Sequence, residues 1–156
     1  MNIDQHTVKK FDADLEEIRS SILKMGGLVE EQIDRALEAL TQGDLALCAM
    51  VEEGDQKVND MEVEIDEKIS RIIAIRQPAA GDLRLVMAFE KTITDLERIG
   101  DEADKIARMT KLIYSSDRIS LPRTTEIRHM SSASKVMLRK SLDALARLDE
   151  TIAVEV

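Results

Sequence analysis

Three acidic residues lie close together in one short stretch of the sequence, LERIGDEADKIARM (residues 96–109). Glu97, Asp101 and Asp104 are spaced by four and three residues, so a helix would place them on one face, where like charges repel. Gly100, between them, costs about 1 kcal/mol relative to Ala in a helix interior. A bound cation would neutralise the carboxylates, because hard multivalent ions prefer oxygen ligands. The stretch therefore predicts a metal site, and Gly100 would leave room beside it.

A second acidic pair has the same spacing. Glu62 and Asp66 form a Glu-x-x-x-Asp pattern like that of Glu97 and Asp101, and both patterns lie beside apolar residues at helical spacing. If the two helices pack side by side, four carboxylates can converge, with Asp104 as a further ligand. The predicted metal ligands are Glu62, Asp66, Glu97, Asp101 and Asp104. The alternative is a solvated acidic face, which spacing alone leaves open in a chain with 31 acidic residues.

The composition predicts a helical globular protein. The chain has 156 residues, of which 44% are hydrophobic, 34% charged and only 2% aromatic, and Pro occurs twice. This mixture favours long helices over a sheet. The net charge of −9 and the scarcity of aromatic residues argue against nucleic acid as a partner. The single cysteine, Cys48, excludes an internal disulfide, and no apolar run is long enough to span a bilayer. We therefore expect a cytoplasmic protein without membrane insertion.

Apolar residues recur at spacings of three and four in four stretches, which predicts an all-α, up-and-down bundle. The predicted helices are His6–Thr41, Asp55–Arg76, Leu83–Tyr114 and Thr125–Leu148. Gly26-Gly27 in the first helix indicates a kink, a break or a close helix contact. Asp44 can cap the segment after it, and the sequence EGD (residues 53–55) is interpreted as a second interruption. The stretch SSDRISLP (residues 115–122) is the expected linker before the last helix.

The fourth stretch resembles the first when the chain is shifted by 105 residues. Ile22 then aligns with Ile127, and Asp44 with Asp149, so that a loop matches a loop. This predicts a three-helix unit over residues 1–115, followed at 116–156 by a linker and the first helix of an incomplete second unit. A chance match of two amphipathic helices is the alternative. If the repeat is real, the chain looks truncated.

Three longer motifs resemble one protein family. They are MGGLVEEQI (residues 25–33), VEEGDQKVNDMEVEIDE (residues 51–67) and RQPAAGDLRLVMAFEKTITDLERIGDEADKIARM (residues 76–109). Their order and sequence are similar to the PhoU family of phosphate-uptake regulators, and the resemblance covers essentially the whole chain. It implies two tandem three-helix units with Glu/Asp-x-x-x-Asp pairs that bind divalent or trivalent metal ions, including multinuclear iron, zinc or manganese clusters. The positions that match are Glu62, Asp66, Glu97 and Asp101, with Asp104 as an addition.

The resemblance also implies a function and partners. PhoU-like proteins are negative regulators of phosphate uptake and of the phosphate-starvation (Pho regulon) response. The implied partners are a Pst-type phosphate ABC transporter and a PhoR-like sensor kinase. The sequence has no Gly-rich phosphate loop and no nucleophile–histidine pair, so we expect no enzyme activity, and the sequence does not support direct binding of phosphate.

Two other interpretations remain. A ferritin-like di-metal oxidase needs Glu-x-x-His on two helices, and this chain has one such pattern, at Glu126 and His129, with His6 as the other histidine. A metal-free structural bundle is the other alternative.

The last predicted helix has an apolar face that its missing repeat partners would cover. This face consists of Ile127, Met130, Leu138, Leu142, Leu145 and Leu148. It could fold back onto its own unit, but packing against a second copy is favoured, which predicts a homodimer or larger homo-oligomer.

Overall fold

The computed structural model describes residues 3–115, 123–154 and 156, with side chains from Lys9 onward. The helices are α1 (Ile3–Gln42), α2 (Leu45–Arg76), α3 (Ala80–Ser115), α4 (Thr125–Arg147) and α5 (Glu150–Val154). No strand occurs in this part of the chain, which confirms the all-α prediction. The predicted linker over residues 116–122 and the side chain of His6 lie outside the described residues.

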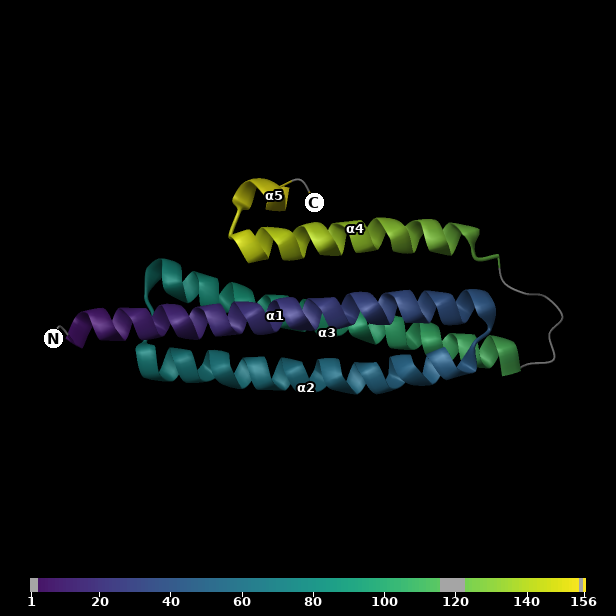
Figure 1. The fold of residues 1–156 in the computed structure, drawn as a ribbon, viewed down its shortest axis with the longest axis horizontal. Helices are drawn as coiled ribbons and strands as arrows, with labels where there is room; N and C mark the ends of the chain where they lie inside the picture. The colour runs from purple at the N-terminus through teal and green to yellow at the C-terminus, as the bar shows by residue number, and fades with distance from the viewer. Residues whose placement is uncertain (1–2, 116–122, 155) are drawn as a thin grey trace.

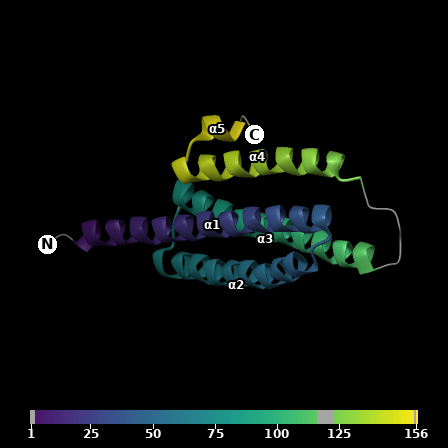
Figure 2. The ribbon, with the colours of Figure 1, turned by 45° about the vertical axis from the view of Figure 1, so that its right-hand side comes forward.

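The three longest helices form an up-and-down bundle, and α4 lies beside it. α1, α2 and α3 contact one another, whereas α4 contacts α1 and the short helix α5. In both ribbon views α4 runs alongside α1 on the side away from α2 (Figure 1, Figure 2). No helix in the described residues is long and apolar enough to cross a bilayer.

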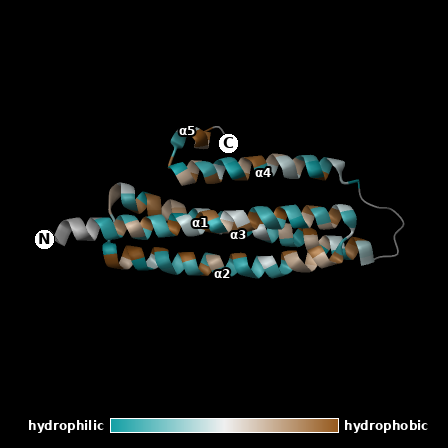
Figure 3. Ribbon diagram, in the orientation of Figure 1, coloured by the Kyte–Doolittle hydropathy of each residue, from teal (hydrophilic) through white to brown (hydrophobic). Residues whose placement is uncertain are grey.

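The core of the three-helix bundle comprises two apolar clusters. Polar and apolar segments alternate along the long helices (Figure 3), as expected for amphipathic helices with one buried face. The larger cluster holds bulky side chains such as Ile22, Ile65 and Phe89, and the smaller one holds mainly small side chains such as Ala36, Cys48 and Ala103. In α3 the buried face includes Phe89, Leu96, Gly100 and Ala107, at the helical spacing expected from the sequence.

The second helix begins ten residues earlier than predicted. Asp44 caps it as expected, since its Oδ1 accepts hydrogen bonds from the backbone N–H groups of Ala46 (2.8 Å) and Leu47 (3.2 Å). The interpretation of residues 53–55 as an interruption is wrong, because α2 runs through Gly54. Helix propensity is overridden here by packing: Cys48 and Val51 are fully buried.

The glycine pair in α1 does not break the helix. Gly26 is buried against α4, and a Cβ atom at this position would lie 2.6 Å from Leu142 Cδ2. A Cβ at Gly27 would meet nothing within 4 Å. Of the alternatives that the sequence left open, the close helix contact is therefore confirmed, and it is made by α4.

The apolar face of α4 is divided between its own chain and solvent. Leu138 is buried in the larger core cluster, and Leu142 and Leu145 pack against that cluster. The sequence favoured a second copy as the cover for these three side chains, and the structure corrects this. Met130 is 71% exposed, and Val136, Met137 and Leu148 are also exposed.

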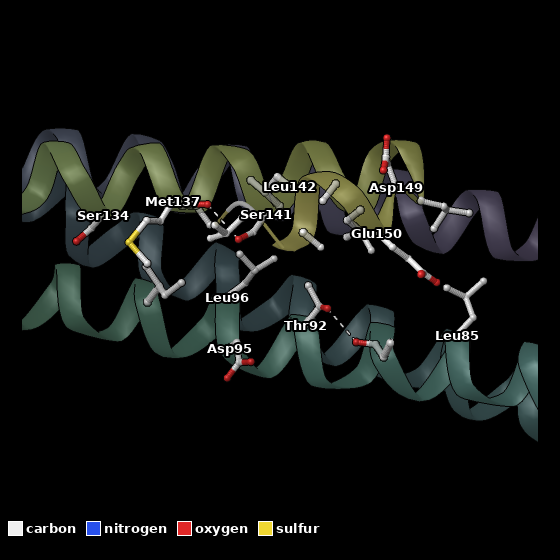
Figure 4. Close-up of a pocket in the computed structure, with 18 residues that line it drawn as sticks. Leu85, Thr92, Asp95, Leu96, Ser134, Met137, Ser141, Leu142, Asp149 and Glu150 are labelled. Carbon is white, nitrogen blue, oxygen red and sulfur yellow. Dashed lines mark hydrogen bonds between the residues drawn. The ribbon is translucent and has the colours of Figure 1, made fainter.

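A groove of about 980 Å³ lies between α3, α4 and α5. Leu96 and Thr92 of α3 point toward α4, and Met137 of α4 points toward α3 (Figure 4). Asp149 points away from this space. The lining is mainly apolar and holds no histidine or cysteine. The groove is therefore a candidate contact surface and has no catalytic groups of those types.

Candidate metal centre

Most of the predicted acidic residues lie at one level of the three-helix bundle. On α3, Glu97 and Asp101 are half-buried and Asp104 is 3% exposed. α3 presents them there because Leu96, Gly100, Ala103 and Ala107 occupy its buried face, and the acids lie beside these apolar residues as the spacing predicted.

This level is the boundary between the two apolar clusters. On each of the three helices, one residue of the larger cluster lies on one side of this boundary and one residue of the smaller cluster lies on the other side. These flanking pairs are Val29 and Ala36 on α1, Val58 and Val51 on α2, and Leu96 and Ala103 on α3. Between them lie polar residues from all three helices, among them Gln32 of α1, Asp55 of α2 and Asp101 of α3, and Asp104 directly follows Ala103. We call this set, with Asn59, Glu62 and Glu97, the oxygen layer.

Asp55 of α2 is part of the oxygen layer, although it was not among the predicted ligands. Its carboxylate lies close to α3, because a Cβ atom at Gly100 would be 3.6 Å from Asp55 Oδ1. Burial raises the pKa of Asp55, and the negative charges of Asp104 and Asp101 raise it further, while Arg108 and a hydrogen bond from Asn59 act in the opposite direction. Three carboxylates therefore share one partly desolvated space.

Four side-chain oxygens in this layer are buried without a hydrogen-bond partner. They are Gln32 Oε1, Asp55 Oδ1, Asn59 Oδ1 and Asp104 Oδ1. An unpaired buried acceptor costs about 1–3 kcal/mol, and a charged one costs more. The other oxygen of Asp104 is paired, since Arg108 Nη2 lies 2.6 Å from Asp104 Oδ2. Orphaned oxygens from three helices are what a hard cation would satisfy, so the residues present fit a metal ion.

Glu97 and Glu62 form the outer edge of the layer. Burial raises the pKa of Glu97, and the charges of Asp101, Glu62 and Asp55, in that order, raise it further. Glu62 of α2 is half-buried, and its charge acts on Glu97 of α3. Both glutamates therefore add negative charge at the edge of the layer.

Asp66 differs from the other predicted ligands. Its side chain is exposed on α2. Among the described side chains, no set of three or more His, Cys, Asp and Glu residues already stands in an arrangement that would hold a metal ion. The metal assignment therefore stays a prediction, and ligation would require the carboxylates to close around the ion.

Sequence reasoning missed Asp55 because EGD (residues 53–55) was interpreted as an interruption, and it missed Asn59 although the predicted helix contained it. With α2 continued through Gly54, Asp55-x-x-x-Asn59 has the same spacing as Glu97-x-x-x-Asp101. Val58, fully buried between them, was the available signal that this segment already faces the core.

The oxidase alternative finds no support in the described part of the chain. Glu126 and His129 are both exposed on α4. A di-iron or di-manganese site of that type requires inward-facing ligands.

The fold and the oxygen layer define a class: a three-helix bundle with a buried carboxylate level and a fourth helix docked on its first helix. Comparison with protein families shows a match to the PhoU domain over residues 22–110, which is more than half of the chain. The chain belongs to the PhoU family. It is 46% identical to a Pseudomonas putida protein described as a phosphate-specific transport system accessory protein PhoU homolog, over 99% of this chain and 60% of that protein.

Other similar proteins are also PhoU proteins. The phosphate-specific transport system accessory protein PhoU of Escherichia coli K12 is 45% identical over 100% of this chain and 64% of its own length. The crystal structure of PhoU from Pseudomonas aeruginosa superposes with a TM-score of 0.86 at 46% identity, covering 93% of this chain and 69% of that one. A regulatory PhoU from Streptococcus pneumoniae gives a TM-score of 0.83 at 28% identity, covering 93% and 67%. The chain thus spans less than two thirds of the length of the Pseudomonas putida and Escherichia coli proteins.

Proposed function

We propose that this chain is a regulatory accessory protein of a phosphate-specific transport system, and that it acts through protein contacts rather than catalysis. The observation that carries the proposal is the 45–46% identity, over essentially the whole chain, to proteins described as accessory to that system. The proposed action is negative regulation of phosphate uptake and of the phosphate-starvation response. The proposed partners are a Pst-type transporter and a PhoR-like sensor kinase, which places the protein in the cytoplasm.

A complementation experiment tests this action. The chain is expressed in a bacterium whose own PhoU has been deleted, and a phosphate-starvation reporter is measured in phosphate-rich medium. We expect the reporter to be repressed relative to the empty vector. Reporter activity equal to that of the deletion strain, with the protein present at normal abundance, would contradict the proposed action.

The second part of the proposal is a metal site in the oxygen layer. Asp55, Glu97, Asp101 and Asp104 would hold a divalent or trivalent ion, with Glu62 and the exposed Asp66 at the outer edge. An iron, zinc or manganese ion or cluster would supply positive charge that offsets carboxylate repulsion and satisfies the orphaned oxygens. Support comes from four buried unpaired oxygens on three helices.

Metal analysis with a matched pair of double variants tests the site. Replacing Glu97 and Asp101 with Ala should strongly reduce bound Mn²⁺ after equilibrium dialysis. Asp95 and Glu102 are the control, because both are exposed acids on the same helix with cationic neighbours, Arg98 and Lys105. Equal metal content in the two double variants would rule out the oxygen layer.

We also propose that the chain associates with a second copy. The supporting observation is the apolar surface that α4 leaves exposed, including Met130 and Val136. Changing both to Glu should shift sedimentation toward monomer at micromolar concentration, whereas His129→Glu on the same helix should not. A clean monomer for the unmodified chain would refute the association.

A further inference from the structure

We propose that Gln32 is a metal-binding residue whose side-chain amide oxygen supplies a neutral ligand from α1 to the cation in the oxygen layer. The inference rests on the metal site of the proposed function. It extends that site from two acidic helices to three, and it makes metal binding a connection between α1 and the α2–α3 pair.

The orientation of the Gln32 amide is fixed by the backbone of α2. The side chain is 2% exposed, and its Nε2 donates a hydrogen bond to the Val51 carbonyl oxygen at 3.3 Å. A carbonyl oxygen can only accept, so the end of the amide that faces Val51 must be the NH₂ group. Oε1 therefore lies at the opposite end, where it has no hydrogen-bond partner.

The free oxygen points at the level of the carboxylates. A Cβ atom at Gly100 would lie 3.1 Å from Gln32 Oε1 and 3.6 Å from Asp55 Oδ1, so the two oxygens flank one point beside α3. Asp104, whose Oδ1 is also buried and unpaired, follows Gly100 by one turn. Neutral amide oxygens and carboxylates together form a typical donor set for hard cations.

Two glycines leave the space that this amide occupies. A Cβ at Gly54 of α2 would lie 3.3 Å from Gln32 Nε2, which complements the 3.1 Å contact expected at Gly100 of α3. Each glycine costs about 1 kcal/mol relative to Ala in a helix. Both glycines make room for the Gln32 side chain. This explains why Gly54 and Gly100 occur in the middle of long helices.

A purely structural Gln32 would be expected to have both ends paired. The NH₂ end is paired and the oxygen end is not, although an unpaired buried acceptor costs about 1–3 kcal/mol. A ligand role accounts for this asymmetry. The same segment of α1 also contacts α4, since Glu30 pairs with Arg139 and Asp34 with Lys135. An ion held by Gln32 would thus act on the helix to which α4 is docked.

The test uses the full chain and Mn²⁺ as the probe. Gln32→Leu removes the oxygen and should weaken Mn²⁺ binding by about tenfold or more in calorimetry. Gln32→Glu keeps an oxygen at the same position but loses the hydrogen bond to the Val51 carbonyl, so it should bind Mn²⁺ more tightly than Gln32→Leu does. Gln56→Leu is the control, because Gln56 is exposed on α2 and its amide pairs with Asp60 outside the layer.

A spectroscopic measurement separates ligation from packing. The measurement uses diamagnetic Zn²⁺, because its effect on chemical shifts is local. The side-chain NH₂ signals of Gln32, assigned by their loss in Gln32→Leu, should shift strongly on Zn²⁺ binding, while those of the exposed Gln56 side chain should shift little. If Gln32→Leu does not fold, Gly100→Ala replaces it, since the added Cβ would displace Oε1 without removing an oxygen ligand.

The outcomes separate this inference from the metal site itself. If the Glu97/Asp101 double variant loses Mn²⁺ while the Gln32 or Gly100 variant binds it with wild-type affinity, the role of Gln32 is overturned and the site stands. Weakened binding in Gln32→Leu, with no shift of the wild-type Gln32 side-chain signals on Zn²⁺ binding, also overturns ligation by the oxygen. If the unmodified chain binds no Mn²⁺, both proposals fail.

Discussion

α1 is packed on two sides, and its two interfaces differ in construction. Toward α2 and α3 it buries a continuous row of bulky side chains, such as Ile18, Ile22 and Met25, and then Gln32 in the oxygen layer. Toward α4 it offers Gly26, which accommodates Leu142, and two acidic residues that pair with Lys135 and Arg139. The first interface is a shared core, whereas the second is a docking contact.

The difference indicates which part of the molecule can move independently. The three-helix bundle encloses both apolar clusters except for Leu138, the one α4 residue buried in them. α4 leaves Met130 and Val136 exposed. Segments with few buried contacts open at lower free energy than the core does. We therefore expect α4 to separate from α1 before the bundle unfolds.

The largest expected effect comes from a cavity in the bundle. Phe89 is 1% exposed in the larger cluster, so Phe89→Ala should lower the free energy of unfolding by about 3–5 kcal/mol in urea denaturation. Leu138→Ala should cost about 2 kcal/mol, because α4 can detach instead of leaving a cavity. Equal losses for the two variants would mean that α4 and the bundle unfold as one unit.

The oxygen layer should make the metal-free bundle less stable as pH rises. The raised pKa of Asp55 means that the folded state binds more protons than the unfolded state between the unfolded value, about 3.9, and the folded one. The loss of stability caused by the buried charge of Asp55 is absent below this pH range and fully present above it. Asp55→Asn should therefore be more stable than wild type by about 1 kcal/mol at neutral pH, with no gain at pH 3.

The control for this prediction is Asp60→Asn, because Asp60 is exposed on the same helix. Measurements in a chelator keep metal from compensating the charge. A stability gain that does not depend on pH, or one that Asp60→Asn shares, would contradict an electrostatic origin in the layer.

Two adjacent glycines allow the docking contact to be tested with a matched pair. Gly27→Ala meets nothing within 4 Å and should stabilise the protein by up to about 1 kcal/mol through helix propensity. The free energy of unfolding of Gly26→Ala should be about 0.5–1.5 kcal/mol lower than that of Gly27→Ala, because the new Cβ forces Leu142 out of its position. Thermal unfolding of both variants measures the difference, and identical values would show that α4 does not rest on Gly26.

The smallest effect is expected from the ion pairs between α1 and α4. Arg139 is 61% exposed where it contacts Glu30, so a double-mutant cycle with Ala at both positions should give about 0.2–1 kcal/mol. The coupling should decrease in 1 M salt because exposed charges are screened. A coupling energy above this range that persists in 1 M salt would show that these ion pairs are shielded from solvent, as contacts in the bundle core are.

Much of the fold could be predicted from the sequence because apolar spacing and helix signals are local. The buried faces of α1 and α3, the cap at Asp44 and the acidic edge containing Glu97, Asp101 and Asp104 are set by positions in the chain and the geometry of a helix. These features need no knowledge of what lies opposite them.

Other features depended on which helices meet. Gly54 looked like an interruption because its packing partner, Gln32, lies on another helix, and Asp55 was missed for the same reason. The sequence could not decide whether Leu138, Leu142 and Leu145 cover their own chain or a second copy, since an apolar stripe is compatible with either. Only the tertiary structure sets Gln32 Oε1, Asp55 Oδ1 and Gly100 beside one another, because their proximity arises from the packing of three helices and not from spacing within any one of them.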